Sequence, residues 1–134
     1  MSPIRWSLLP LVMLGGTLGV AAREALLLLA PGDGAPLMTL AINLLGSALL
    51  GVVVGALDDR HPRWRAALGT GAMGGFTTYS AFAVQVVSSS APVPGVALAL
   101  ATLAGGVLAG VVGLLAGRAL VRRPDEIEDP VEAE

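Results

Sequence analysis

The stretch Gly74 to Phe82, GGFTTYSAF, puts two glycines and four consecutive hydroxyl-bearing residues inside an uncharged block of 52 residues, Ala66 to Gly117. Glycine has no Cβ atom and can adopt conformations that end a helix. Unwound backbone deep in an apolar segment exposes carbonyls that bind a cation and amides that bind an anion. The hydroxyls of Thr77 to Ser80 add donors at the same place. An unwound backbone at this place would therefore form an ion site.

A continuous helix also accommodates the stretch, because Ser and Thr hydroxyls can bond back to the carbonyl four residues earlier. Tyr79 and Phe82 lie three residues apart, so their rings share a face wherever the chain is helical. The edge of an aromatic ring is positively polarised. Two ring edges facing a narrow path would therefore contact a small anion without a full charge. The residues themselves leave the unwound and the helical interpretation open.

A second polar feature is a stripe that repeats every four residues along one apolar run: Thr39, Asn43, Ser47, Gly51 and Gly55. The same spacing recurs at Gly15, Gly19 and Arg23, and at Thr102, Gly106 and Gly110. Small residues at this spacing favour close packing of helices in lipid. The amide of Asn43 is different, because in hydrocarbon it needs a polar partner or a wet cavity. Asn43 is therefore either a packing contact or part of a polar path.

The elements that must position these residues are membrane helices. The chain is 54% hydrophobic and 13% charged, against about 25% charged in soluble domains. Apolar runs of the roughly 20 residues that cross a bilayer lie at about 6–30 and 37–57, and the uncharged block is long enough for two more. We predict an all-α membrane domain with four transmembrane helices over residues 1–121. The polar, acidic residues 122–134 are predicted to be a disordered tail.

Three segments in this order resemble the signature segments of the CrcB/Fluc family of fluoride channels: GGTLGVAAR (15–23), TLAINLLGSALLG (39–51) and GGFTTYSAF. The resemblance covers the first three predicted helices and, by hydropathy, the fourth. It implies a channel of the bacterial cell (inner) membrane, not an enzyme, that lets fluoride leave the cell passively and so protects against its toxicity. It also implies an antiparallel, dual-topology homodimer, a break in the third helix and a structural sodium ion at the dimer interface.

The resemblance assigns roles to individual residues. The backbone carbonyls of Gly74 and Thr77 would bind the sodium ion. The positions that match the fluoride pathway and its vestibule are Arg23, Asn43, Tyr79 and Phe82, and we expect the hydroxyls of Thr78 and Ser80 to act as further donors. Two features depart from the family: Tyr79 stands where phenylalanine is usual, and the fourth helix offers only Thr102 as a hydroxyl.

Two other functions fit four small helices. A proton-coupled exporter of the small multidrug-resistance type needs a membrane-embedded carboxylate in its first helix, and Glu24 is the candidate. Glu24 directly follows Arg23 near the helix end, and the chain has few aromatic residues to hold a lipophilic cation. A non-transporting assembly subunit would use the glycine stripes for packing alone. No motif indicates a nucleic-acid partner; fluoride, sodium and membrane lipid are the expected ones.

The arginines favour a single orientation. With four spans, seven of the eight basic residues lie on one side of the membrane: Arg5, Arg60, Arg63, Arg65, Arg118, Arg122 and Arg123. Only Arg23 lies towards the other side. Trp6 and Trp64 belong to the same interface. The positive-inside rule then predicts cytoplasmic termini. An antiparallel homodimer needs both orientations, so the charges favour a heterodimer with an oppositely oriented homologue, whereas the resemblance favours the homodimer.

Overall fold

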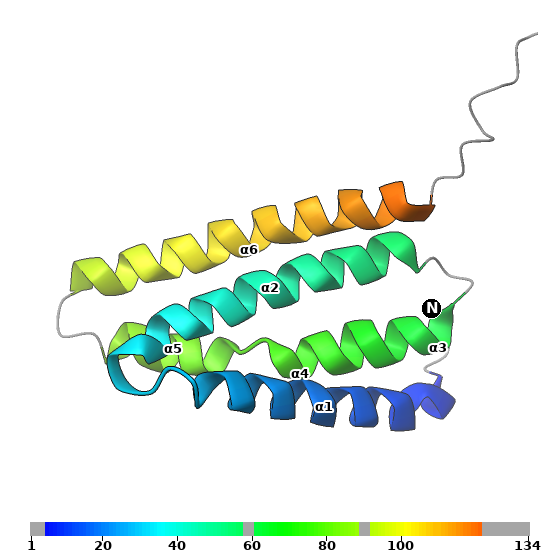
Figure 1. Cartoon of the computed structure of the whole chain (residues 1–134), viewed down its shortest axis with the longest axis horizontal. Coiled ribbons are helices and arrows are strands. Elements are labelled where there is room, and N and C mark those ends of the chain that lie inside the picture. The colour runs from blue at the N-terminus through cyan, green and yellow to red at the C-terminus, as the bar shows by residue number, and fades with distance from the viewer. Residues whose placement is uncertain (1–4, 58–60, 89–91, 122–134) are drawn as a thin grey trace, which may run out of the picture.

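The computed structural model describes residues 5–57, 61–88 and 92–121. These residues form helices and short connections, with no β-strand among them. The helices lie side by side as four rods (Figure 1). The predicted all-α class is therefore confirmed, whereas the predicted tail at 122–134 lies outside the described residues.

The first rod is the 3₁₀ turn η1 (Trp6–Leu8) followed by α1 (Leu9–Leu27). The second is η2 (Gly32–Gly34) followed by α2 (Ala35–Ala56), and the fourth is α6 (Pro92–Val121). The third rod is segmented into α3 (Pro62–Trp64), the π-helix η3 (Arg65–Met73), α4 (Gly74–Phe76) and α5 (Tyr79–Val87). The first, second and fourth rods are each long and apolar enough to cross a membrane.

The closest packing between rods occurs in two pairs. The main partner of α2 is α6, and α1 packs chiefly on η3 and α4 (Figure 1). Glycines allow these approaches: a Cβ on Gly51 would lie 2.7 Å from the Leu114 nitrogen, and one on Gly19 would lie 2.8 Å from the Phe76 nitrogen. The prediction that the small-residue stripes are packing surfaces is confirmed for these two pairs of rods.

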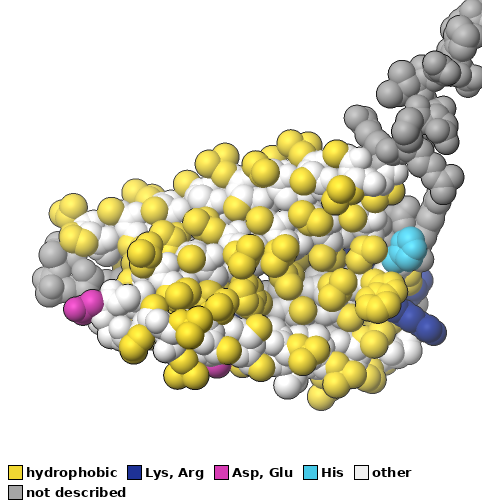
Figure 2. Space-filling view, viewed as in Figure 1, with side chains coloured by type: hydrophobic (Ala, Val, Ile, Leu, Met, Phe, Trp, Pro, Cys, Tyr) yellow, Lys and Arg dark blue, Asp and Glu magenta, His cyan; other side chains and the backbone are white. Residues whose placement is uncertain are grey.

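Apolar side chains cover most of the face of the bundle that Figure 2 shows. Among the described residues, Ile42 and Phe76 are the buried hydrophobic residues, while many leucines and valines on every rod are exposed. A large exposed apolar surface indicates contact with lipid or with other protein. The sides of the bundle are therefore suited to contact with lipid or with another protein chain.

The basic residues gather at one end of the bundle. Arg5 precedes η1, Arg63 and Arg65 lie at the start of the third rod, and Arg118 lies near the end of α6, so all four belong to the same end (Figure 1). Arg23 lies near the opposite end of α1. The other three arginines of the predicted cluster lie outside the described residues. The charge asymmetry is present in the fold, and the orientation stays a prediction.

Candidate functional site

The third rod leaves helical geometry at two residues. Thr77 has φ −76° and ψ 157°, and Thr78 has φ −144° and ψ 122°, so both are extended between α4 and α5. Gly74 is helical, with φ −63° and ψ −34°, and Gly32 is the positive-φ glycine of the described chain. Of the two interpretations that the sequence left open, the unwound one holds at Thr77 and Thr78, while Gly74 and Gly75 stay in the helical segment α4. The extended segment is Thr77–Thr78.

Glycines instead let neighbouring rods approach this segment. A Cβ on Gly75 would collide with the Gly16 carbonyl oxygen of α1. On the α2 side, a Cβ on Gly46 would collide with Thr77 Cγ2 and would lie 3.1 Å from Phe76 Cδ1. The extended segment is thus held between α1 and α2, with room for backbone but not for larger side chains.

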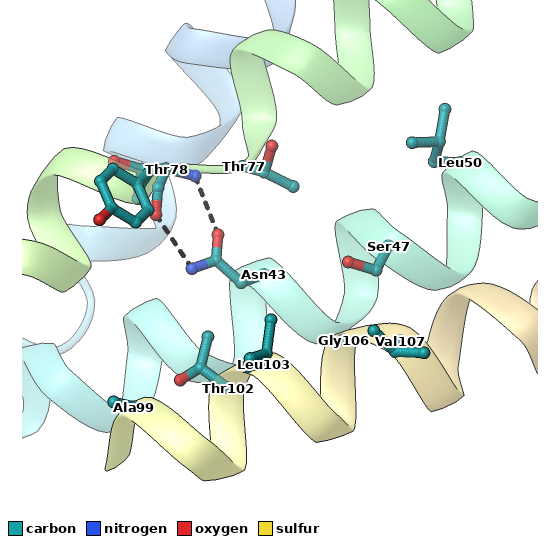
Figure 3. A pocket seen from close by; sticks show the side chains of 11 residues that line it. Asn43, Ser47, Leu50, Thr77, Thr78, Ala99, Thr102, Leu103, Gly106 and Val107 are labelled. Atoms are coloured by element: carbon teal, nitrogen blue, oxygen red, sulfur yellow. Dashed lines mark hydrogen bonds between the residues drawn. The ribbon is translucent and has the colours of Figure 1, made fainter. Parts of the chain in front are cut away.

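Asn43 replaces the helical hydrogen bond that the Thr78 N–H has lost and adds a second bond at the Thr78 carbonyl. The Thr78 N–H donates to Asn43 Oδ1 at 2.8 Å, and Asn43 Nδ2 donates to the Thr78 carbonyl at 3.0 Å (Figure 3). The side-chain amide therefore pairs with one residue's backbone as a neighbouring strand would, which satisfies groups that are costly to bury unpaired. In a continuous helix the Thr78 N–H would bond to Gly74. The Gly74 carbonyl has lost that donor.

The hydroxyls of this region have specific partners. Thr78 is buried, with 7% of its surface exposed, and its Oγ1 accepts the Ala81 N–H at 3.2 Å and so caps α5. Thr78 Oγ1 and Ser80 Oγ lie 3.3 Å apart and share a hydrogen bond. Thr77 Oγ1 donates to the Met73 carbonyl at 3.0 Å. The two predicted donors, Thr78 and Ser80, are therefore adjacent.

Arg23 reaches the same segment from α1. Its Nη1 donates to the carbonyls of Gly75 at 3.2 Å and of Thr77 at 3.3 Å. Its Nε and Nη2 donate to Glu24 Oε1 at 3.2 and 3.0 Å. The side chain is only 19% exposed. Arg23 thus pairs with Glu24 and also binds the extended segment, a role that the sequence did not indicate.

Two open grooves meet at Thr78. The first has a volume of about 460 Å³ and runs between α2, the extended segment and α6 (Figure 3). Its polar lining is Asn43, Ser47, Thr77, Thr78, Tyr79 and Thr102. The second has a volume of about 400 Å³ and is lined by Arg23, Glu24, Leu27, Thr78, Ser80, Ala81 and Val84. Thr78 lines both grooves, so it separates the Arg23 end from the α6 side.

Thr102 and Ser47 also line the first groove, although neither was predicted to be a site residue. Thr102 Oγ1 is buried and has no hydrogen-bond partner within the described part of the chain. A buried hydroxyl without a partner is costly. Both residues belong to the four-residue stripes in the sequence, and that periodicity was the available signal.

The aromatic positions are only partly described. Tyr79 begins α5, lines the first groove and is 80% exposed. Phe82 lies one turn further along α5, but its side chain lies outside the described residues. The predicted pair of ring edges on one path is therefore untested.

The two carbonyls expected to bind sodium, those of Gly74 and Thr77, differ in the hydrogen bonds that they already accept. Gly74 is exposed, its carbonyl has lost the Thr78 donor, and no atom from another described rod lies within 4 Å of a Cβ built on it. The Thr77 carbonyl already accepts from Arg23 at 3.3 Å, which leaves one lone pair beside a charged guanidinium. The Gly74 carbonyl therefore fits a cation better than the Thr77 carbonyl does.

Residues 10–118 match the family model described as CrcB-like protein, Camphor Resistance (CrcB). The chain belongs to this family. It is 40% identical over 122 residues to the fluoride-specific ion channel FluC of Variovorax paradoxus, covering 84% of this chain and 98% of that protein. It is 39% identical over 132 residues to the protein of the same name from Xanthomonas euvesicatoria, covering 91% and 98%.

A shorter and more similar match is the FluC channel of Albidiferax ferrireducens, at 48% identity over 80 residues, or 57% of this chain. The chain spans 62% of that protein's length and 63% of the Erythrobacter litoralis relative. CrcB family membership and the three apolar helices of membrane-spanning length make this a multi-pass protein of a bacterial membrane.

Proposed function

We propose that the protein is a fluoride-selective channel through which fluoride leaves the bacterial cell passively, which protects the cell from fluoride toxicity. Family membership and the names of the relatives support a channel over an enzyme. The single observation that carries the proposal is the extended segment Thr77–Thr78, held inside the bundle by Asn43 where two grooves meet. It offers polar groups at membrane depth without an isolated charge.

Fluoride binds water tightly, so a selective path must replace that water with donors at close range. One N–H of Asn43 Nδ2 is bound to Thr78, and an amide carries two. The second N–H, with the unpartnered hydroxyl of Thr102, supplies donors along the first groove. On the other side of Thr78, Ser80 and Arg23 line the second groove. We propose that fluoride passes these groups in turn, with the ring edges of Tyr79 and Phe82 between them.

We further propose that a second copy, oppositely oriented, completes the pathway. The first groove is open on one side, and Tyr79 beside it is 80% exposed, so both leave a surface for a second chain to cover. Backbone carbonyls of Gly74 and Thr77 from both copies would hold a sodium ion between them. That ion would supply a fixed positive charge, buried in protein and not in lipid. The partner is either this same chain or a homologue, as the arginine asymmetry favours.

The exporter alternative requires a carboxylate that is free to exchange a proton with the transported cation. Glu24 accepts two hydrogen bonds from Arg23, which already satisfies its charge. The geometry therefore favours the channel.

Fluoride efflux from liposomes loaded with fluoride and containing the purified protein tests the proposal. We expect efflux that dissipates a fluoride gradient and generates a membrane potential, with chloride in place of fluoride giving at least a hundredfold slower movement (about 2.7 kcal/mol of discrimination). Chloride movement at a comparable rate, or electroneutral exchange that depends on a proton gradient, would disprove it.

A further inference from the structure

We propose that Glu24 is a positioning residue for the anion pathway, which orients the guanidinium of Arg23 and cancels its charge at the mouth of the second groove. The inference rests on the proposed function, because it assigns Glu24 a role in anion permeation.

The guanidinium of Arg23 binds the Glu24 carboxylate through one edge and backbone carbonyls of the third rod through Nη1. Nε and Nη2 both donate to Glu24 Oε1, while Nη1 donates to the carbonyls of Gly75 and Thr77. Four hydrogen bonds therefore use four of the five N–H groups that an arginine carries. Because the guanidinium is planar and rigid, the carboxylate on one edge determines where Nη1 points on the other.

The position of Glu24 is unfavourable for its own helix. Glu24 lies in the last turn of α1, which ends at Leu27, and the C-terminal end of a helix repels negative charge. Neighbouring residues in a helix also do not face each other, so Arg23 must fold back to reach its partner. Helix stability therefore does not explain a carboxylate here, whereas its contact with Arg23 does.

The charge balance matters because of where the pair lies. Arg23 and Glu24 line the second groove together with Thr78 and Ser80. A lone guanidinium at this place would attract fluoride but would also retain it. The paired carboxylate, which is 58% exposed, leaves the groove mouth neutral while the N–H dipoles of Arg23 stay in place. Glu24 thus allows a cation to hold the backbone without becoming an anion trap.

The test compares fluoride flux in Glu24→Gln with that of the wild-type protein over a range of fluoride concentrations, at low and at high concentrations of an impermeant salt. The glutamine keeps an acceptor oxygen for Arg23 but removes the charge. One unpaired charge about 4 Å from a monovalent anion in water changes its binding constant roughly fivefold. We expect the half-saturating fluoride concentration and the maximal flux to fall, the former about fivefold at low salt. About 1 M salt should shrink that shift to less than twofold, because screening is then nearly complete over this distance.

Three further variants separate charge from structure. Asp33→Asn removes the same charge in η2, outside the groove, and should leave half-saturation unchanged. Glu24→Asp keeps the charge and should stay within twofold of the wild-type half-saturation. The double variant Arg23→Gln, Glu24→Gln should regain the wild-type half-saturation but not the maximal flux, since the bonds to Gly75 and Thr77 are lost.

The outcomes are distinct. If Glu24→Gln elutes as a single folded species but lowers only the maximal flux, with half-saturation unmoved at low salt, Glu24 is merely structural and the proposal is overturned. An equal shift in Asp33→Asn would also overturn it, since the effect would then be a general surface charge. A wild-type protein without fluoride flux would instead overturn the proposed function.

Discussion

Replacing Asn43 by leucine tests whether the extended segment depends on a side chain from another rod. The change keeps an apolar residue of similar size on α2 but removes both hydrogen bonds to Thr78, at 2.8 and 3.0 Å. The Thr78 N–H would then lack a partner, at about 1–3 kcal/mol, whereas the Thr78 carbonyl, at the N-cap of α5, still accepts the first bond of that helix. Because the adjacent groove of about 460 Å³ can admit water, we expect the lower part of that range, about 1–2 kcal/mol.

The loss of these hydrogen bonds would destabilise the extended conformation of Thr77 and Thr78 and not the bundle as a whole. A continuous helix through Thr77 and Thr78 would return the Thr78 N–H to the Gly74 carbonyl. About 1–2 kcal/mol shifts the balance between these conformations roughly 5- to 30-fold. Because the substitution also removes the amide donor from the groove, we expect Asn43→Leu to abolish fluoride efflux from liposomes and to change the hydrogen exchange of the 77–81 backbone amides, while the apolar packing of α2 on α6 is kept.

Ser47→Ala is the matched control, because Ser47 lines the same groove one turn along α2, whereas the hydrogen bonds to the Thr78 N–H and carbonyl come from Asn43. It should leave the exchange of residues 77–81 unchanged. Wild-type exchange and wild-type flux in Asn43→Leu would refute the conclusion that this amide holds the segment. Lost flux with wild-type exchange would instead restrict Asn43 to contact with the ion.

Three further predictions concern the pathway and its orientation. Thr102→Val removes the unpartnered hydroxyl at nearly constant volume, so flux should fall at least tenfold while the thermal unfolding temperature stays equal or rises; unchanged flux would exclude Thr102 from the path. Phe82→Ile should cut flux sharply and Tyr79→Phe only mildly, if the rings act through their edges; a dead Tyr79→Phe channel would show that the hydroxyl is essential. Single cysteines at Ser2 and Gly32 in the native membrane should each label from one side only, with a homologous partner gene present or deleted, and equal labelling from both sides would establish dual topology.

The apolar runs of the sequence were sufficient to predict the helices. Whether about 20 residues can cross a bilayer depends on their own length and hydropathy, and the first, second and fourth rods follow those limits closely. The sequence also predicted that the first helix packs closely against another helix, because Gly15 and Gly19 lie four residues apart on one face. It did not show that the partner is η3. The site could be placed near residues 74–82 for the same reason: hydroxyls and glycines are concentrated there.

The sequence by itself determined the four-rod architecture, the family and the location of the polar residues, because these depend on local composition and on motifs within single helices. Only the tertiary structure decided that Thr77 and Thr78, not the glycines, leave the helix. The bond that the Thr78 N–H loses is replaced by one to Asn43, which lies 35 residues away in the chain. It likewise decided that Arg23, 54 residues from Thr77, holds that carbonyl while Glu24 holds Arg23. A hydrogen bond between rods depends on which faces the packing brings together, and no local pattern in the sequence contains that information.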